Sequence, residues 1–225
     1  MRWMPLLILA TLVAAQPSRV APAVRICVLQ DMSGSIQQTR TEILKPDQLR
    51  RLAQVINQRG GEIAFGLIAE QSDRPLLRLP LDIIPPEPEK PKNPLLQKQF
   101  EKKKAEWNQK MQDRRTRIDQ FAQEVQSRMG GPLSKKTDVC GGIRRCDLFL
   151  AEPYGRPSLD FLLVVSDGLH NVRASPCPEA LRSRARLLLV NGEGLQGVLK
   201  LYRPIPFEAI DPAVEFIRRE VEKKP

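Results

Sequence analysis

The chain has 225 residues, of which 41% are hydrophobic and 5% aromatic, and its formal net charge at pH 7 is +10. This composition is sufficient for a hydrophobic core, and after N-terminal trimming the length suits one domain of about 200 residues. The charge could attract an acidic partner, but a basic face exposed to water explains it more simply. Because basic and aromatic residues do not alternate as base stacking requires, we expect no nucleic-acid partner.

The N-terminus has the pattern of a signal peptide. Arg2 precedes an apolar stretch over residues 6–15, and residues 13–15 and 21–23 both suit cleavage. The stretch is shorter than the roughly 20 residues of a transmembrane helix. We therefore predict that residues 1–23 form a signal peptide with a short linker, and that the chain is exported to the periplasm or the extracellular space. An uncleaved membrane anchor is the alternative.

Four cysteines suit an exported protein, because disulfides persist in oxidising compartments. They allow three full pairings, and the sequence does not choose among them. Cys27 lies in a predicted strand, where we expect a buried thiol. Cys140, Cys146 and Cys177 are the disulfide candidates, and either of the first two could pair with Cys177. There is no C-x-x-C spacing and no second histidine to support a zinc site.

The first half of the predicted domain, which spans residues 24–225, alternates strands with a helix. Residues 24–29 are apolar and β-branched, as in a buried strand. A helix is expected from Pro46, with apolar positions at helical spacing and an end at the two glycines 60 and 61. Residues 63–69 form a second buried strand. Residues 76–84 have the alternation and the prolines of a short edge strand.

A long charged insertion follows. Residues 85–94 are rich in proline and form a stiff linker. Residues 95–129 contain no Pro or Gly and predict a helix of about 35 residues, roughly 50 Å long. The helix has an apolar seam with spacings of three, four and seven: Phe100, Trp107, Met111, Ile118, Phe121 and Val125. It either lies on its own domain or projects to meet a partner or a second copy of the chain.

The second half continues the alternation of strands and helices. Its expected elements are a helix over residues 139–150, strands over 160–166, 185–190 and 205–210, a short helix over 195–202, and a terminal helix capped by Asp211 with Pro212 at its first position. Several of the strands are apolar throughout. The chain therefore predicts an α/β fold with a doubly wound, mainly parallel sheet flanked by helices, and with the long charged helix inserted before the loop of Thr137.

Small oxygen-bearing side chains follow the first strand. Asp31, Ser33 and Ser35 place one carboxylate and two hydroxyls at alternate positions. Such hard oxygen ligands suit Mg²⁺ (or Mn²⁺) better than Zn²⁺, although the same residues could simply cap a helix. Asp167 also follows an apolar strand, and Thr137 lies in a polar loop. Because ligands bind at the carboxyl ends of parallel strands, we expect these three segments to meet at one edge of the sheet.

This set of motifs resembles the von Willebrand factor A-type (integrin I-like) domain over nearly all of the chain after residue 23. Asp31, Ser33 and Ser35 match D-x-S-x-S, Thr137 matches the separate threonine loop, and Asp167 matches the strand-end aspartate. The resemblance implies a metal-ion-dependent adhesion site. In such a site the two serines bind the metal directly, the threonine joins on engagement, and the aspartates act largely through water.

The chain departs from the family pattern in its inserted segment, and it contains two other candidate threonines. The linker over residues 85–94 and the helix over residues 95–129 are larger than the compact family pattern. Thr39 and Thr41 are other hydroxyl candidates, but they lie too close to Asp31 in sequence to supply a third loop.

The resemblance implies a Mg²⁺-dependent protein-binding module that takes a carboxylate from a protein partner. The alternative is a structural interaction protein that acts through the basic helix 95–129, for example by self-association, with an incidental metal site. We expect no enzyme. His170 is the single histidine, and no nucleophile–base pair, nucleophile elbow or carboxylate cluster accompanies it.

Overall fold

The computed structural model describes residues 21–36, 41–57, 59–72, 74–173, 175–191 and 197–223. Residues 1–20 of the predicted signal peptide, and Thr39, lie outside the described residues. The elements are β1 (Ala23–Asp31), α2 (Pro46–Ile56), β2 (Gly61–Ile68), β3 (Leu77–Leu81), η1 (Pro94–Leu96), α3 (Gln97–Met129), α4 (Val139–Ala151), β4 (Ser158–Val165), β5 (Arg186–Val190), η2 (Gly197–Tyr202), β6 (Ile205–Phe207) and α5 (Ile210–Glu222).

The strands that the structure describes form one six-stranded sheet in the order β3-β2-β1-β4-β5-β6. β1 lies at its centre and pairs in parallel with β2 and β4, and β5 and β6 continue the parallel pairing. Among these strands β3 alone is antiparallel, and it carries Pro80 at the edge, where a missing backbone donor is tolerated. The predicted doubly wound α/β fold is confirmed.

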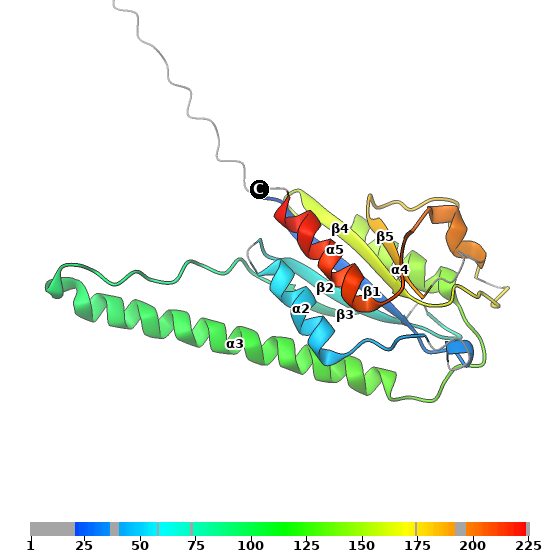
Figure 1. Cartoon of the computed structure of the whole chain (residues 1–225), viewed down its shortest axis with the longest axis horizontal. Coiled ribbons are helices and arrows are strands. Elements are labelled where there is room, and N and C mark those ends of the chain that lie inside the picture. The colour runs from blue at the N-terminus through cyan, green and yellow to red at the C-terminus, as the bar shows by residue number, and fades with distance from the viewer. Residues whose placement is uncertain are drawn as a thin grey trace, which may run out of the picture.

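Apolar side chains alternate along the strands and build one core on each face of the sheet. Val24, Ile26 and Val28 of β1 join the core beneath α2, α5 and the end of α3. Cys27 and Leu29 point to the opposite core, beneath α4. Figure 1 shows α2 and α5 on one side of the sheet and α4 behind it. The centre of β1 is therefore buried on both faces, which explains its nearly unbroken apolar sequence.

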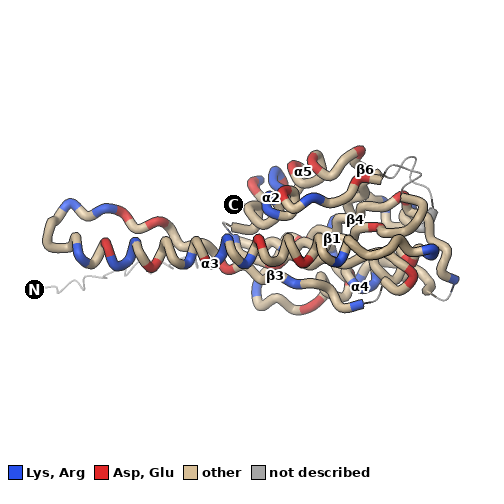
Figure 2. The backbone as a smooth tube through the Cα atoms, turned by 90° about the horizontal axis from the view of Figure 1, so that it is seen from below, with Lys and Arg blue, Asp and Glu red and all other residues tan. Residues whose placement is uncertain are grey.

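Helix α3 both packs and projects. Its last turns lie against α2 and β3 and bury Phe121, Val125 and Met129. Near residue 114 it leaves the body, where Arg114 Nε donates to Asn57 Oδ1 at 2.9 Å. Residues 85–110 then extend away as a hairpin of linker and helix, which we call the arm (Figures 1 and 2). No helix of the described residues combines the length and the apolar character needed to cross a bilayer.

The chain leading into α5 differs from the prediction. The strand over 205–210 ends at Phe207, and residues 197–202 form a 3₁₀ helix. Asp211 does not cap α5, because the N-cap position is Ala209. The N–H of Ile210, which has no partner within the helix, instead donates to Glu42 Oε2 at 2.7 Å. Asp211 Oδ1 accepts from Gln48 Nε2 at 2.8 Å, so both carboxylates join the start of α5 to the region of α2.

Two disulfides attach α4 to the rest of the domain. Cys27 of β1 pairs with Cys146, with their Cα atoms 5.7 Å apart. Cys140, in the first turn of α4, pairs with Cys177 at a Cα–Cα distance of 4.6 Å. The expectation of a free thiol at Cys27 was wrong, because its side chain points to the face that α4 covers. The candidate bridge to Cys177 is formed by Cys140.

The buried guanidinium of Arg25 caps the C-terminal end of α4. Arg25 of β1 is 1% exposed, and its guanidinium donates to the carbonyl oxygens of Leu150 at 2.9 Å and Glu152 at 3.0 Å. The guanidinium also lies 4.7 Å from the centre of the Phe149 ring. Because the last carbonyls of a helix have no partners within it and carry partial negative charge, Arg25 stabilises this end both as donor and as cation.

We expect Arg25→Ala to lower the free energy of unfolding by about 3 kcal/mol, because it leaves buried carbonyls unpaired and opens a cavity. Urea denaturation followed by circular dichroism measures the change. Arg218→Ala removes an arginine that bridges neighbouring glutamates on the exposed face of α5, and should cost much less stability, because water screens these ion pairs. Equal effects of the two substitutions would contradict the capping role of Arg25.

Candidate metal centre

The site begins where the two central strands end side by side. Asp31 is the last residue of β1, and its neighbour Gln30 pairs with Val165, the last residue of β4. Ser166 follows directly, and its hydroxyl donates to Asp31 Oδ2 at 2.6 Å. Asp31 Oδ1 accepts from the Ser33 backbone N–H at 2.8 Å. The fully buried carboxylate is therefore fixed by both loops.

The hydroxyls of the D-x-S-x-S stretch lie close together. Ser33 Oγ and Ser35 Oγ form a hydrogen bond with each other at 2.9 Å, and Ser33 is 2% exposed. Octahedral Mg²⁺ with bonds of about 2.1 Å places neighbouring ligand oxygens about 3.0 Å apart. The spacing of the two serine oxygens therefore fits adjacent positions on one magnesium ion.

The threonine loop is attached to this stretch by backbone hydrogen bonds. Gly34 N donates to Ser134 O at 2.8 Å, and Ser134 N donates to Met32 O at 2.8 Å. Three residues later, Thr137 is 3% exposed, and its N–H donates to Asn171 Oδ1 at 2.7 Å. Thr137 thus lies between the loop after β1 and the loop after β4, at the edge where the sequence placed it.

Asp167 adds a second carboxylate. Its Oδ1 accepts from Leu169 N at 3.0 Å, while its buried Oδ2 has no hydrogen-bond partner among the described residues. Burial raises the pKa of Asp31, the hydrogen bonds from Ser166 and Ser33 oppose this rise, and the charge of Asp167 adds to it. Two mutually repelling carboxylates beside paired hydroxyls form a donor set that suits a divalent cation.

The five predicted site residues therefore lie at one edge of the sheet. Within the described ranges, no group of three or more His, Cys, Asp or Glu side chains is arranged to hold a metal. The donor set at this edge consists instead of three hydroxyls and two carboxylates. His170 lies three residues beyond Asp167, and its buried Nδ1 has no hydrogen-bond partner among the described residues.

Sequence reasoning missed the residues that hold the candidate metal ligands in place. Ser166 had a usable signal, because it is a hydroxyl at the end of an apolar strand next to β1. Asn171 had none, since its role depends on a loop contact 34 residues away in sequence.

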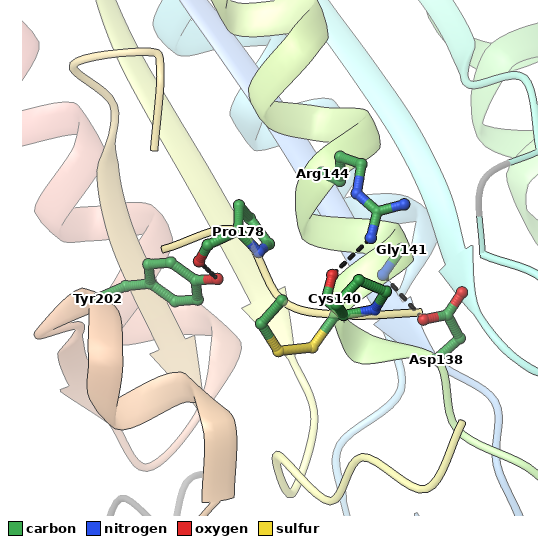
Figure 3. Close-up of a disulfide and its surroundings, with 8 residues drawn as sticks. Asp138, Cys140, Gly141, Arg144, Pro178 and Tyr202 are labelled. Atoms are coloured by element: carbon green, nitrogen blue, oxygen red, sulfur yellow. Dashed lines mark hydrogen bonds between the residues drawn. A yellow bond between two sulfur atoms is a disulfide. The ribbon is translucent and has the colours of Figure 1, made fainter. Parts of the chain in front are cut away.

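The loop that carries Asn171 is fastened to α4. The Cys140–Cys177 disulfide joins it to the first turn of the helix, and Asp138 caps the same turn by accepting from Gly141 N at 2.8 Å (Figure 3). Arg144 donates to the Pro176 carbonyl oxygen. The support of Thr137 by Asn171 therefore rests on a covalently restrained loop.

For the Mg²⁺ site predicted from the sequence, we expect Asn171→Ala to weaken binding of the ion by about 2- to 10-fold, the value of one hydrogen bond, because the backbone N–H of Thr137 loses its acceptor, Asn171 Oδ1. Calorimetric titration measures the affinity, and amide exchange of residues 134–138 should accelerate. Asn171→Asp retains the acceptor and should restore slow exchange. Unchanged exchange in the alanine variant would contradict this role for Asn171.

A cavity of about 830 Å³ adjoins the site. Met32 and Ser134, which flank the loop contact described above, form part of its wall. The rest comes from the end of β2, the β2–β3 connection, the end of α3 and the loop after α3, and includes Leu67, Arg74, Arg128 and Met129. The cavity wall thus combines apolar side chains with two guanidinium groups and the carboxylate of Glu70.

Comparisons with known proteins give low similarity. No protein-family model and no curated protein matches the chain. Among solved structures, a von Willebrand factor type A protein from Catenulispora acidiphila is 15% identical, with a TM-score of 0.47, over 90% of this chain and 42% of that one. The pilus adhesin SpaC from Lactobacillus rhamnosus GG in an open conformation is 9% identical, with a TM-score of 0.46, over 90% and 30%. Proximal thread matrix protein 1 from the mussel byssus is 12% identical, with a TM-score of 0.43, over 90% and 48%. The chain thus spans less than half the length of each of these structures.

Proposed function

We propose that this chain is a protein-binding module whose divalent cation, Mg²⁺ or Mn²⁺, accepts a carboxylate from a protein partner. Ser33 and Ser35 would hold the ion directly, Thr137 would join on engagement, and Asp31 and Asp167 would lie behind them. The observation that carries the proposal is the 2.9 Å spacing of the two serine hydroxyls beside the buried Asp31. The module is proposed to act by binding and not by catalysis.

The chemistry of the donor set supports an acidic ligand. When bound, the cation supplies an electron-poor centre that can take one further oxygen ligand. Neutral hydroxyls leave more of its charge uncompensated than carboxylate ligands would. Asp31 is held by Ser33 and Ser166, so it stays in place without needing to bind the ion.

The surroundings of the site suit a peptide segment. Leu169 is 48% exposed two residues after Asp167 and offers an apolar contact. The adjoining cavity is large enough for several side chains, and the charged groups Glu70, Arg74 and Arg128 in its wall favour a polar neighbour of the bound carboxylate. A partner is therefore expected to present an Asp or Glu within an extended or looped segment.

Selection from a random peptide display library tests this proposal. Peptides captured in Mg²⁺ and eluted with EDTA should share an Asp or Glu, and the amide analogue of a selected peptide should not bind. Ser33→Ala with Ser35→Ala should abolish capture, whereas Ser127→Ala, at the end of α3, should not. Capture that persists in EDTA and in the double variant would contradict the proposal.

The alternative function, interaction through the long helix, is favoured by the exposure of the arm. It predicts binding that resists chelation and is lost when arm residues are changed. The two disulfides support the proposal that the chain acts outside the reducing cytosol.

A further inference from the structure

The tip of the arm presents two leucines to solvent. Residues 90–100, which we call the arm tip, contain the turn between the linker and α3. Leu95 is 87% exposed and Leu96 is 45% exposed. The turn is ordered, because Asn93 Oδ1 accepts from Leu95 N at 3.0 Å and Asn93 O accepts from Leu96 N at 3.1 Å. These bonds hold the backbone of the turn, which places both leucines at the apex of the arm.

The part of the arm between its tip and the body keeps this apex away from the body. Trp107 Nε1 donates to the Pro85 carbonyl oxygen at 3.0 Å, and Lys104 forms an ion pair with Glu87. These contacts fasten the stiff linker to α3. About 17 residues of helix separate Gln97, where α3 begins, from the body, roughly 25 Å. Figure 1 shows the arm extending from one end of the sheet, while β1 and β4 end toward the other.

Unpaired lysines surround the apex. The arm tip contains three lysines and no acidic residue. The exposed lysines of the tip and of the adjoining helix make no ion pair within the described part of the chain: Lys90, Lys92, Lys98, Lys102 and Lys103. Residues 85–110 contain seven lysines, four glutamates and no arginine, so the arm keeps a net positive charge of three (seven minus four). Figure 2 shows basic residues on both the linker and the helix of the arm near its tip, with acidic residues farther along each.

We propose that the arm tip docks on an anionic lipid surface, with Leu95 and Leu96 inserted at the headgroup level and the lysines on the charged headgroups. A lipid surface accommodates a convex pair of leucines without a matching groove, and diffuse negative charge suits flexible lysine ammonium groups. Protein interfaces are instead depleted in lysine and enriched in arginine and aromatic residues. The composition of the tip therefore favours lipid over an acidic protein.

This proposal is independent of the metal centre. It implies that a membrane-docked chain points the ends of β1 and β4, and hence the candidate metal centre, away from the lipid. It also gives the projecting half of α3 a function. The fold does not require this half, because the buried part of the helix begins near Phe121.

Sedimentation of the full chain with vesicles in EDTA tests the proposal. We expect vesicles of phosphatidylcholine with phosphatidylglycerol to bind more chain than vesicles of phosphatidylcholine alone, and added salt to remove the difference. Leu95→Ser with Leu96→Ser should weaken the phosphatidylglycerol-dependent binding about tenfold or more. Leu201→Ser, at a leucine 64% exposed on η2, is the matched control and should leave it unchanged.

Each result of the vesicle experiment supports or overturns the proposal. Equal binding to the two kinds of vesicle, or unchanged binding of the double leucine variant, would overturn the proposal, and in that case an acidic protein becomes the better partner for the tip. Replacement of Lys90, Lys92 and Lys98 by glutamine should reduce the binding in the same way. Because these side chains are exposed, circular dichroism of every variant should match that of the unchanged chain.

Discussion

Asp31→Asn is expected to weaken Mg²⁺ binding about 10- to 100-fold while the fold remains intact. The amide keeps the shape of the carboxylate and an oxygen for the Ser33 N–H, so the loop should retain its conformation. What it removes is a buried negative charge held beside the hydroxyls of Ser33 and Ser35. Without that charge, and with Asp167 as the remaining carboxylate, the attraction for a divalent cation falls.

Calorimetric titration with Mg²⁺ and with Mn²⁺ measures this loss, and thermal unfolding without metal checks the fold. Asp113→Asn is the matched control, because Asp113 lies on α3 and its contact is with Gln109 on the same helix. Its Mg²⁺ affinity should equal that of the unchanged chain. If Asp31→Asn binds Mg²⁺ as tightly as the control, the aspartate has no part in holding a cation.

Removal of the Cys27–Cys146 disulfide is expected to lower the free energy of unfolding by about 4 to 5 kcal/mol. The bridge spans 119 residues of sequence, and a long closed loop restricts the unfolded chain strongly. The bridge also ties the central strand to α4, the helix that covers one face of the sheet. Urea denaturation of the Cys27→Ala, Cys146→Ala variant measures the loss.

The other disulfide provides a control with a different readout. Cys140→Ala with Cys177→Ala opens a loop of 37 residues and should cost somewhat less stability. It also frees the loop that carries Asn171, so it should weaken Mg²⁺ binding, whereas the Cys27 variant should not. A stability loss below about 1 kcal/mol for the Cys27 variant, or equal effects of both variants on Mg²⁺ affinity, would contradict these separate roles.

The layout of the site could be predicted because it depends on strand direction. Asp31 and Asp167 each follow an apolar run, and parallel pairing of β1 with β4 brings the ends of such runs to one edge. The apolar residues of β1 likewise predicted a strand buried on both faces. The apolar runs and the residues that follow them are local in sequence, and parallel strand pairing fixes where they lie.

Features that depend on contacts between distant residues could not be predicted in this way. Burial of Cys27 follows from its strand, but its partner depends on which face α4 covers. Asp211 has the sequence signature of a cap, yet Glu42 takes that role because tertiary packing places its carboxylate at Ile210 N. Both halves of α3 contain many charged residues, so the sequence did not reveal that one half packs and the other projects.

Crystals grown with Mn²⁺ offer the most direct test of the proposed metal centre. An anomalous difference map should show one strong manganese peak bonded to Ser33 Oγ and Ser35 Oγ, with Asp31, Thr137 and Asp167 around it. A map without a peak at this edge of the sheet, or with manganese held elsewhere in the domain, would contradict the proposal that this is a cation-dependent binding site.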